Sequence, residues 1–256
     1  PHHIIDIIDP DEPWSLADFQ QAAGYAVQEI HQKEKIPLLV GGTGQYIKAI
    51  LEQWEIPKHP PNPALRNFLS EWSSRVSPQK FHNYLALLDP VAANFIDPTN
   101  SRRVIRALEV ILQSGRKFSE QRKKGIPPYH FLILGLHRHR LQLYQRIDQR
   151  IDKMLENGFI EEVKGLLSQG YSPNLPSMSA IGYQQIISYL QGIITLDEAI
   201  QIIRRSTRNF VRRQANWFKF NDPSIHWFSL QDQDKTIIID QILLRINQFL
   251  YENQPT

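Results

Sequence analysis

Two glycines and a threonine directly after an apolar run form the first candidate site in this chain. The stretch IPLLV over 36–40 is followed by Gly41, Gly42 and Thr43, and a helical pattern starts at once. Loops of this kind at the carboxyl end of a parallel strand bind phosphate or another ligand. A Walker A loop requires a lysine directly before its Ser or Thr, and this stretch has none. A strand-to-helix turn capped by Thr43 and a ligand-binding loop are therefore both open interpretations.

The second candidate is a basic and aromatic segment over 204–220. Between Arg204 and Lys219 there are six Lys or Arg residues and no acid. Arg204, Arg208 and Arg212 recur every four residues, which places them in one stripe if the segment is helical. Arginine binds phosphate through paired hydrogen bonds, and aromatic side chains stack on splayed bases. The segment favours RNA or another phosphate-rich ligand, and a solvated basic face over an aromatic core is the alternative.

A third group of cations lies at the start of a predicted helix in NSRRVIRALEV. Arg102, Arg103 and Arg106 are placed where the helix macrodipole disfavours positive charge. An anionic partner and a salt bridge to an acid elsewhere explain the cluster equally well.

Two further segments carry weaker signals. In QRIDQRIDKM, Arg146 and Arg150 share one helical face, and Asp148 and Asp152 share the adjacent one. A charged solvent face with i, i+4 partners is the usual explanation, and an arginine that stabilises a diphosphate is the alternative. MSAIGYQQI contains small and hydroxyl residues around Gly182 that suit a close backbone approach.

Composition narrows the class of protein. The 256 residues are 41% hydrophobic, which suffices for a sizeable core, and no apolar run is long enough to span a membrane. The absence of cysteine excludes disulfides, thiolate catalysis and cysteine-bound zinc, and it fits a cytoplasmic protein. The histidines show no metal-binding spacing, so we expect no metal-ligating side chains.

The elements that must position these residues alternate between strands and helices at both ends of the chain. We expect a strand over 2–9, a helix with Ser15 as N-cap, the strand over 36–40 and a further helix. After a proline pair, Pro127-Pro128, we expect a strand in YHFLILGL, several helices including one from about Thr195 to Phe220, a strand in IHWFSL and a last helix over 235–251.

The middle of the chain is different. Four prolines over 56–63 mark a boundary, and only helices are predicted over 64–125. We therefore predict an α/β fold, with a parallel-sheet core formed by 1–60 and 126–256 and an all-helical insertion over 61–125.

Taken together, these segments resemble the tRNA dimethylallyltransferase (tRNA isopentenyltransferase) family. The resemblance rests on the order and spacing of PHHIIDIIDP, LLVGGTGQYIKAIL, SRRVIRALEV, QRIDQRIDKML, LPSMSAIGYQQI and STRNFVRRQANWFK, which cover nearly the whole chain. It implies transfer of a dimethylallyl group from dimethylallyl diphosphate to N6 of the adenosine 3′-adjacent to the anticodon. It also implies a P-loop-kinase-like core, a helical insertion that grips the tRNA anticodon stem-loop, and Mg²⁺ bridging the diphosphate oxygens.

The resemblance also implies roles for single residues. Thr43 is expected to contact the target adenosine, Arg66 to make a second tRNA contact, and Arg150 to bind the diphosphate. The other residues expected to bind tRNA are Arg102, Arg103, Val104, Ile105, Arg106, Ser179, Ala180, Ile181, Gly182, Tyr183, Gln184, Arg208, Arg212, Arg213, Gln214, Ala215, Asn216, Trp217, Phe218 and Lys219.

The chain departs from the family pattern in one respect. The P-loop of the family and the Asp that acts as general base lie upstream of PHH and are not among these residues, so the core is incomplete at the N-terminus and no catalytic residue is assigned within the chain. We expect residues 1–256 alone to be inactive or nearly so, and the full-length protein to be an active, monomeric transferase. The alternatives are a non-catalytic RNA-binding module and a relative of small-molecule P-loop kinases.

Overall fold

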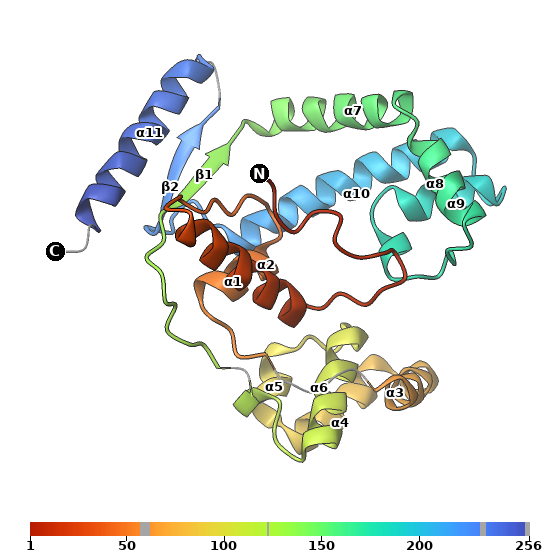
Figure 1. The fold of residues 1–256 in the computed structure, drawn as a ribbon. Coiled ribbons are helices and arrows are strands. Elements are labelled where there is room, and N and C mark those ends of the chain that lie inside the picture. The colour runs from red at the N-terminus through yellow and green to blue at the C-terminus, as the bar shows by residue number, and fades with distance from the viewer. Residues whose placement is uncertain (57–61, 122, 231–233, 254–256) are drawn as a thin grey trace. The chain divides into compact units, whose positions relative to one another are not determined.

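The chain forms two compact units (Figure 1). The computed structural model describes residues 1–56, 62–121, 123–230 and 234–253. The larger unit consists of Pro1–Ile47 and Tyr129–Thr256, and the smaller unit is Lys48–Pro128. The boundary predicted at residue 60/61 lies outside the described residues. Within the described residues, no helix has the length and apolarity needed to cross a membrane.

The larger unit combines a small sheet with helices. Its elements are α1 (Leu16–Gln32), the start of α2 (Gly44–Leu51), β1 (Ile133–His137), α7 (Arg140–Glu156), α8 (Phe159–Ser168), the 3-10 turn η2 (Ser177–Ser179), α9 (Tyr183–Leu190), α10 (Leu196–Trp217), β2 (Ile225–Ser229) and α11 (Lys235–Glu252). The expected N-cap of α1 is confirmed, because the Asp18 amide donates to Ser15 Oγ over 3.2 Å and the Asp18 carboxylate accepts from the Ser15 amide.

The sheet is parallel, as predicted, and consists of β1 and β2. Ile133 lies opposite Ile225, and His137 lies opposite Ser229. The strands expected in YHFLILGL and IHWFSL are therefore confirmed, as is the fold class, a mixed α/β chain with a small parallel sheet. Helices α7 to α10 form the connection between the two strands.

Two predicted strands do not form. Over 2–9 the backbone has positive φ at Ile4 (61°) and Asp6 (56°), which takes it out of the extended conformation. The segment over 36–40 has the apolar sequence of a strand, but in the described part of the chain it does not pair with another strand. Its apolar side chains are exposed to solvent, and Val40 is 90% exposed. An apolar run forms a strand only where a neighbouring strand can accept and donate its backbone hydrogen bonds.

Four helices and η2 enclose the core of the larger unit. Ile147 and Ile151 of α7, Val163 of α8, Ile186 of α9 and Ile203 of α10 belong to one buried cluster. Helices α7 and α10 lie alongside each other (Figure 1). The two helices run in opposite directions, because Arg204 of α10 pairs with Asp152 of α7 and Arg208 pairs with Asp148.

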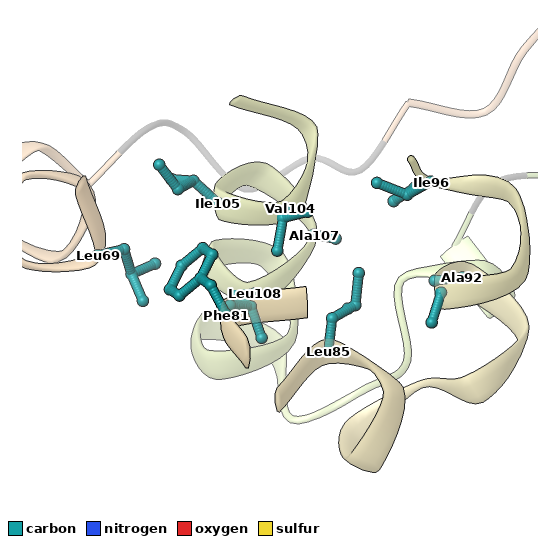
Figure 2. Close-up of a cluster of buried hydrophobic side chains, with 10 residues drawn as sticks. Leu69, Phe81, Leu85, Ala92, Ile96, Val104, Ile105, Ala107 and Leu108 are labelled. Atoms are coloured by element: carbon teal, nitrogen blue, oxygen red, sulfur yellow. The ribbon is translucent and has the colours of Figure 1, made fainter. Parts of the chain in front are cut away.

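The smaller unit is helical, as its sequence predicts. After the end of α2 it contains α3 (Pro63–Arg75), α4 (Pro78–Leu88), α5 (Pro90–Phe95), α6 (Ser101–Ser114) and the 3-10 turn η1 (Ser119–Gln121). Figure 2 shows side chains of α3, α4, α5 and α6 meeting in its core, among them Leu69, Phe81 and Leu108. An antiparallel bridge between Trp54 and Lys124 joins the two segments at which the chain enters and leaves this unit.

Candidate nucleic-acid interface

The Gly-Gly-Thr loop lies against the C-terminal end of α10. Gln214 Nε2 of α10 donates to the carbonyl oxygen of Gly42 over 3.1 Å. A Cβ atom at Gly42 would overlap the Gln214 side chain, and one at Gly44 would overlap Trp217 Cβ and Cγ. Gly44 is therefore needed for the close approach by α10, whereas the flexible end of the Gln214 side chain can move away from a Cβ at Gly42, and neither glycine has a positive φ. Packing against α10 thus accounts for Gly44, and the ligand-binding interpretation of the loop stays a prediction.

Thr43 is exposed beside this contact. Its carbonyl oxygen accepts from the amides of Tyr46 and Ile47 over 3.0 and 3.1 Å, so Thr43 directly precedes α2, while a capping hydrogen bond from its hydroxyl stays a prediction. A residue at this position keeps its side chain open to a ligand at the same time. The structure thus brings together Thr43 and the end of α10, which are more than 170 residues apart in the chain.

In the basic stripe of α10, Arg204 and Arg208 form ion pairs within the protein, whereas Arg212 is exposed to solvent. Arg204 Nη2 lies 2.5 Å from Asp152 Oδ1, and Arg208 Nη2 lies 2.5 Å from Asp148 Oδ2. Both aspartates belong to α7, so they pair across to α10 rather than with arginines of their own helix. The predicted i, i+4 pairing within QRIDQRIDKM is therefore wrong for these two acids. Arg208, which is expected to bind tRNA, already has a carboxylate partner.

The last turn of α10 and the residues after it are more open. Arg212, Arg213, Ala215, Asn216 and Lys219 are exposed, whereas Gln214, Trp217 and Phe218 are half-buried. Arg212, Arg213 and Lys219 form no ion pair with an acid in the described part of the chain. This end of α10 can therefore offer cations, beside partly exposed aromatic side chains, to an anionic ligand.

The loop before α9 is held by contacts of its own. Gly182 adopts a φ of 107°, which favours glycine, and a Cβ there would press on the Phe159 ring. Tyr183 donates its hydroxyl proton to Glu162 Oε1 and packs edge-on against Phe159 at 5.2 Å. Burial, followed by the Glu162 carboxylate, raises the pKa of Tyr183 to about 12. These two residues shape the loop, while Ser179, Ala180, Ile181 and Gln184 are exposed for contact.

In the smaller unit, the arginines at the start of α6 differ in the same way: two are exposed, and Arg106 forms an ion pair. Arg102 and Arg103 are exposed and form no ion pair within the described ranges. Val104 and Ile105 are buried in the core, so their side chains face away from any ligand. Of the residues 102–106 expected to bind tRNA, the first two are placed to meet a polyanion.

Arg66 and Arg106 converge on one buried acid. Arg66 Nη2 and Arg106 Nη1 lie 2.7 and 2.8 Å from Glu109 Oε2, and the Asn62 amide donates to Glu109 Oε1 over 2.9 Å. Burial alone raises the pKa of Glu109, but these hydrogen bonds outweigh it and hold the pKa below its ordinary value of 4.5. We call Glu109, Arg66 and Arg106 the Glu109 cluster.

Sequence reasoning missed Glu109. Its neighbours Ala107, Leu108 and Val110 are buried, so the residue is an acid within an apolar helical stretch, three positions after Arg106. An isolated acid among core positions is a signal of a buried ion pair. The partner Arg66 could not be identified in this way, because it is 43 residues away in the sequence.

Arg150 is exposed on α7 and forms no ion pair within the described ranges. Its expected role with a diphosphate stays a prediction. No three His, Asp or Glu side chains gather into a possible metal site in the part of the chain that the structure describes.

Comparison with known proteins adds independent findings. A family profile described as IPP transferase matches residues 1–221. A tRNA dimethylallyltransferase of Dehalococcoides mccartyi is 43% identical over 242 residues, which is 94% of this chain and 74% of the relative. The solved tRNA isopentenylpyrophosphate transferase of Bacillus halodurans is 39% identical with a TM-score of 0.69, covering 98% of this chain and 79% of that one.

A third similar structure comes from a eukaryotic protein. It is a dimethylallyltransferase described as acting on tRNA, with a TM-score of 0.80 and 26% identity. The similarity covers 100% of this chain and 66% of that one. The likeness thus extends from bacterial to eukaryotic relatives.

Proposed function

We propose, because the chain belongs to the IPP transferase family, that it modifies tRNA by prenyl transfer. The dimethylallyl group would pass from dimethylallyl diphosphate to N6 of the adenosine 3′-adjacent to the anticodon. The observation that carries this proposal is the packing of the Thr43 loop on the end of α10, which gathers an exposed hydroxyl and the cations of Arg212, Arg213 and Lys219.

The chemistry requires two kinds of assistance. An exocyclic adenine amine is a weak nucleophile, so its proton must be accepted as the new C–N bond forms, and the departing diphosphate must be stabilised. Thr43 can hold the adenosine by a hydrogen bond and so orient its amine. Arg150 is our candidate for the departing diphosphate. Mg²⁺ would arrive bound to the diphosphate oxygens of the donor, which are its preferred ligands.

Recognition of the RNA would involve both units. In the larger unit, Arg212 to Lys219 and the exposed residues of the loop before α9 supply cations and stacking surfaces. In the smaller unit, Arg102 and Arg103 supply further positive charge, and the exposed part of Arg66 is held by the Glu109 cluster. We propose that the smaller unit grips the anticodon stem-loop, and that the protein acts as a monomer in the cytoplasm, where tRNA is found.

The decisive measurement is mass spectrometry of tRNA nucleosides after incubation of the full-length protein with tRNA, Mg²⁺ and dimethylallyl diphosphate. We expect N6-dimethylallyladenosine to form. Thr43→Val, which removes the hydroxyl at similar volume, should lower the rate, and Thr43→Ser should retain most of it. A wild-type rate in Thr43→Val would remove the Thr43 hydroxyl from the reaction.

One observation supports a second candidate, a non-catalytic RNA-binding module. Residues 1–256 contain no GxxxxGK[ST] loop for the donor diphosphate. We propose that these residues alone bind tRNA but transfer little or no prenyl group. If the full-length protein also binds tRNA without forming the product, the binding-module function is supported instead. Absence of both binding and transfer would overturn both candidates.

A further inference from the structure

A surface pocket of about 510 Å³ lies between α7 and α10 and is lined largely by arginines. Five arginines, Arg140, Arg204, Arg205, Arg208 and Arg212, contribute to it together with Tyr144. We call it the α7–α10 pocket. It lies within the larger unit. Arg205 belongs to the basic segment over 204–220, but neither Arg140 nor Tyr144 was expected from the sequence to bind a ligand.

Only part of this positive charge is neutralised by the protein. Asp148 and Asp152 pair with Arg204 and Arg208. The other three arginines of the α7–α10 pocket have no acid partner in the described part of the chain. Five arginines against two aspartates leave an excess of three positive charges around one pocket. Such an excess attracts an anion carrying several charges.

Tyr144 holds two of these arginines close to each other. The guanidinium carbons of Arg140 and Arg208 lie 5.3 and 5.1 Å from the centre of its ring, and Arg140 Nε donates to the Tyr144 hydroxyl over 2.9 Å. Stacking on a ring limits the motion of a guanidinium while leaving most of its N–H groups available. The cost of bringing two like charges to one ring is offset when an anion binds between them.

The position of the α7–α10 pocket argues against the donor diphosphate as its ligand. The pocket is long: on α10, Arg212 lies five residues, or about 7.5 Å along the helix axis, from Trp217, whereas Arg205 lies twelve residues, or about 18 Å, from it. The Thr43 loop packs at the Trp217 end. A single diphosphate is too short to span this length, whereas the phosphates of a nucleic-acid backbone recur along it.

We propose that the α7–α10 pocket is a second RNA-binding subsite, in which Arg140 and Arg205 bind backbone phosphates of the same RNA whose adenosine meets Thr43. This inference rests on the proposed function and extends it. The subsite would fix the register of the RNA on α10 without contacting a base, because phosphate contacts position a nucleic acid but carry no sequence information.

The test measures tRNA binding by the full-length protein at several salt concentrations. Arg140→Ala and Arg205→Ala remove cations that have no acid partner, so the fold should be retained, which circular dichroism checks. Each change should weaken binding about three- to tenfold. Each should also reduce the slope of log K against log salt by roughly 0.7 to 0.9, the value for one lost phosphate contact.

Arg146→Ala is the matched control. Arg146 is exposed on the same helix, but it follows Tyr144 by two residues and so lies about 200° around α7 from the pocket. We expect its loss to change affinity by less than about twofold. Equal losses for Arg146→Ala and Arg205→Ala would indicate general attraction to a basic surface and would overturn the subsite.

Competition with inorganic pyrophosphate separates a free diphosphate from RNA phosphate. If the pocket binds a free diphosphate, Arg140→Ala and Arg205→Ala will weaken pyrophosphate binding and leave the salt dependence of tRNA binding unchanged, which overturns the proposal. Unchanged tRNA binding in Arg140→Ala and Arg205→Ala, with a loss in Arg213→Ala, which lies outside the pocket lining, overturns the subsite but not the proposed function. A wild-type protein that binds no tRNA overturns both.

Discussion

Arg66 and Glu109 form an ion pair in which Nη2 and Oε2 are 2.7 Å apart, although Glu109 is fully buried and the Arg66 side chain is 41% exposed. One end of the pair is therefore fixed in the core of the smaller unit while the other reaches solvent. The same carboxylate also binds Arg106, whose side chain is 31% exposed. A single buried acid thus holds two surface cations in place.

Glu109→Gln should destabilise the smaller unit by about 2 kcal/mol, the scale of hydrogen bonds to a charged group. The folded-state pKa of Glu109 is lowered, so its contribution is fully present above the unfolded-state value of 4.5 and is lost as the pH falls through the folded-state pKa. In denaturant unfolding, the free energy of unfolding of the variant and that of the wild type should differ by a constant amount near neutral pH. This difference should shrink below pH 4.5.

Glu71→Gln provides the control for this experiment. Glu71 pairs with Arg75 on the surface of the same unit, and both side chains are mostly exposed. Exposed pairs contribute little, so this change should cost well under 1 kcal/mol. If Glu71→Gln loses as much stability as Glu109→Gln, then removal of any negative charge, and not loss of the Glu109 cluster, determines the effect.

The arginines at the start of α6 should separate into two functional classes. Arg106 belongs to the Glu109 cluster, so Arg106→Ala should lower the melting temperature as well as RNA affinity. Arg102→Ala and Arg103→Ala remove exposed cations and should weaken tRNA binding and its salt dependence at an unchanged melting temperature. Thermal unfolding and filter binding on the three variants would test this division. It is wrong if Arg102→Ala and Arg103→Ala leave affinity unchanged.

Local signals in the sequence predicted the local features of the fold. The Ser15 N-cap of α1 and the apolar strands β1 and β2 were predicted correctly because each depends on residues close together in the chain. The segment over 36–40 has the same apolar character but forms no strand, because a strand also requires a partner that the segment itself does not specify.

The site depends on contacts that no local pattern encodes. The residues Gly42 and Gln214 are 172 positions apart, and the sequence around each says nothing of the other. In the same way, the stripe of Arg204, Arg208 and Arg212 was recognised from its helical spacing. The spacing does not show that Asp152 and Asp148 form ion pairs with Arg204 and Arg208. Helical periodicity predicts which residues share a face, and the opposing helix decides what they contact.

Gly44→Ala should disturb the interface between α2 and α10. The new Cβ would overlap Trp217 close to its backbone, where a rotation of the ring gives little relief. Overpacking of this kind costs about 1–3 kcal/mol, more than the small gain expected from alanine in a helix. We expect a lower melting temperature and weaker tRNA binding. Gly41→Ala is the matched control, because nothing lies within 4 Å of a Cβ there. Equal effects of the two changes would contradict the packing argument.

Tyr183 should ionise only in strongly alkaline solution. Burial and the Glu162 carboxylate raise its pKa from 10.0 to about 12, so its contribution to stability is complete below pH 10.0 and is lost as the pH rises toward 12. The stability difference between the wild type and Tyr183→Phe should therefore be constant up to pH 10.0 and then decline. Glu162→Gln should lower the pKa of Tyr183, measured by phenolate absorbance against a Tyr183→Phe blank. Glu161→Gln, which removes an acid from the same turn of α8, should leave it unchanged. A Tyr183 that titrates alike in both glutamine variants would show that burial alone determines its pKa.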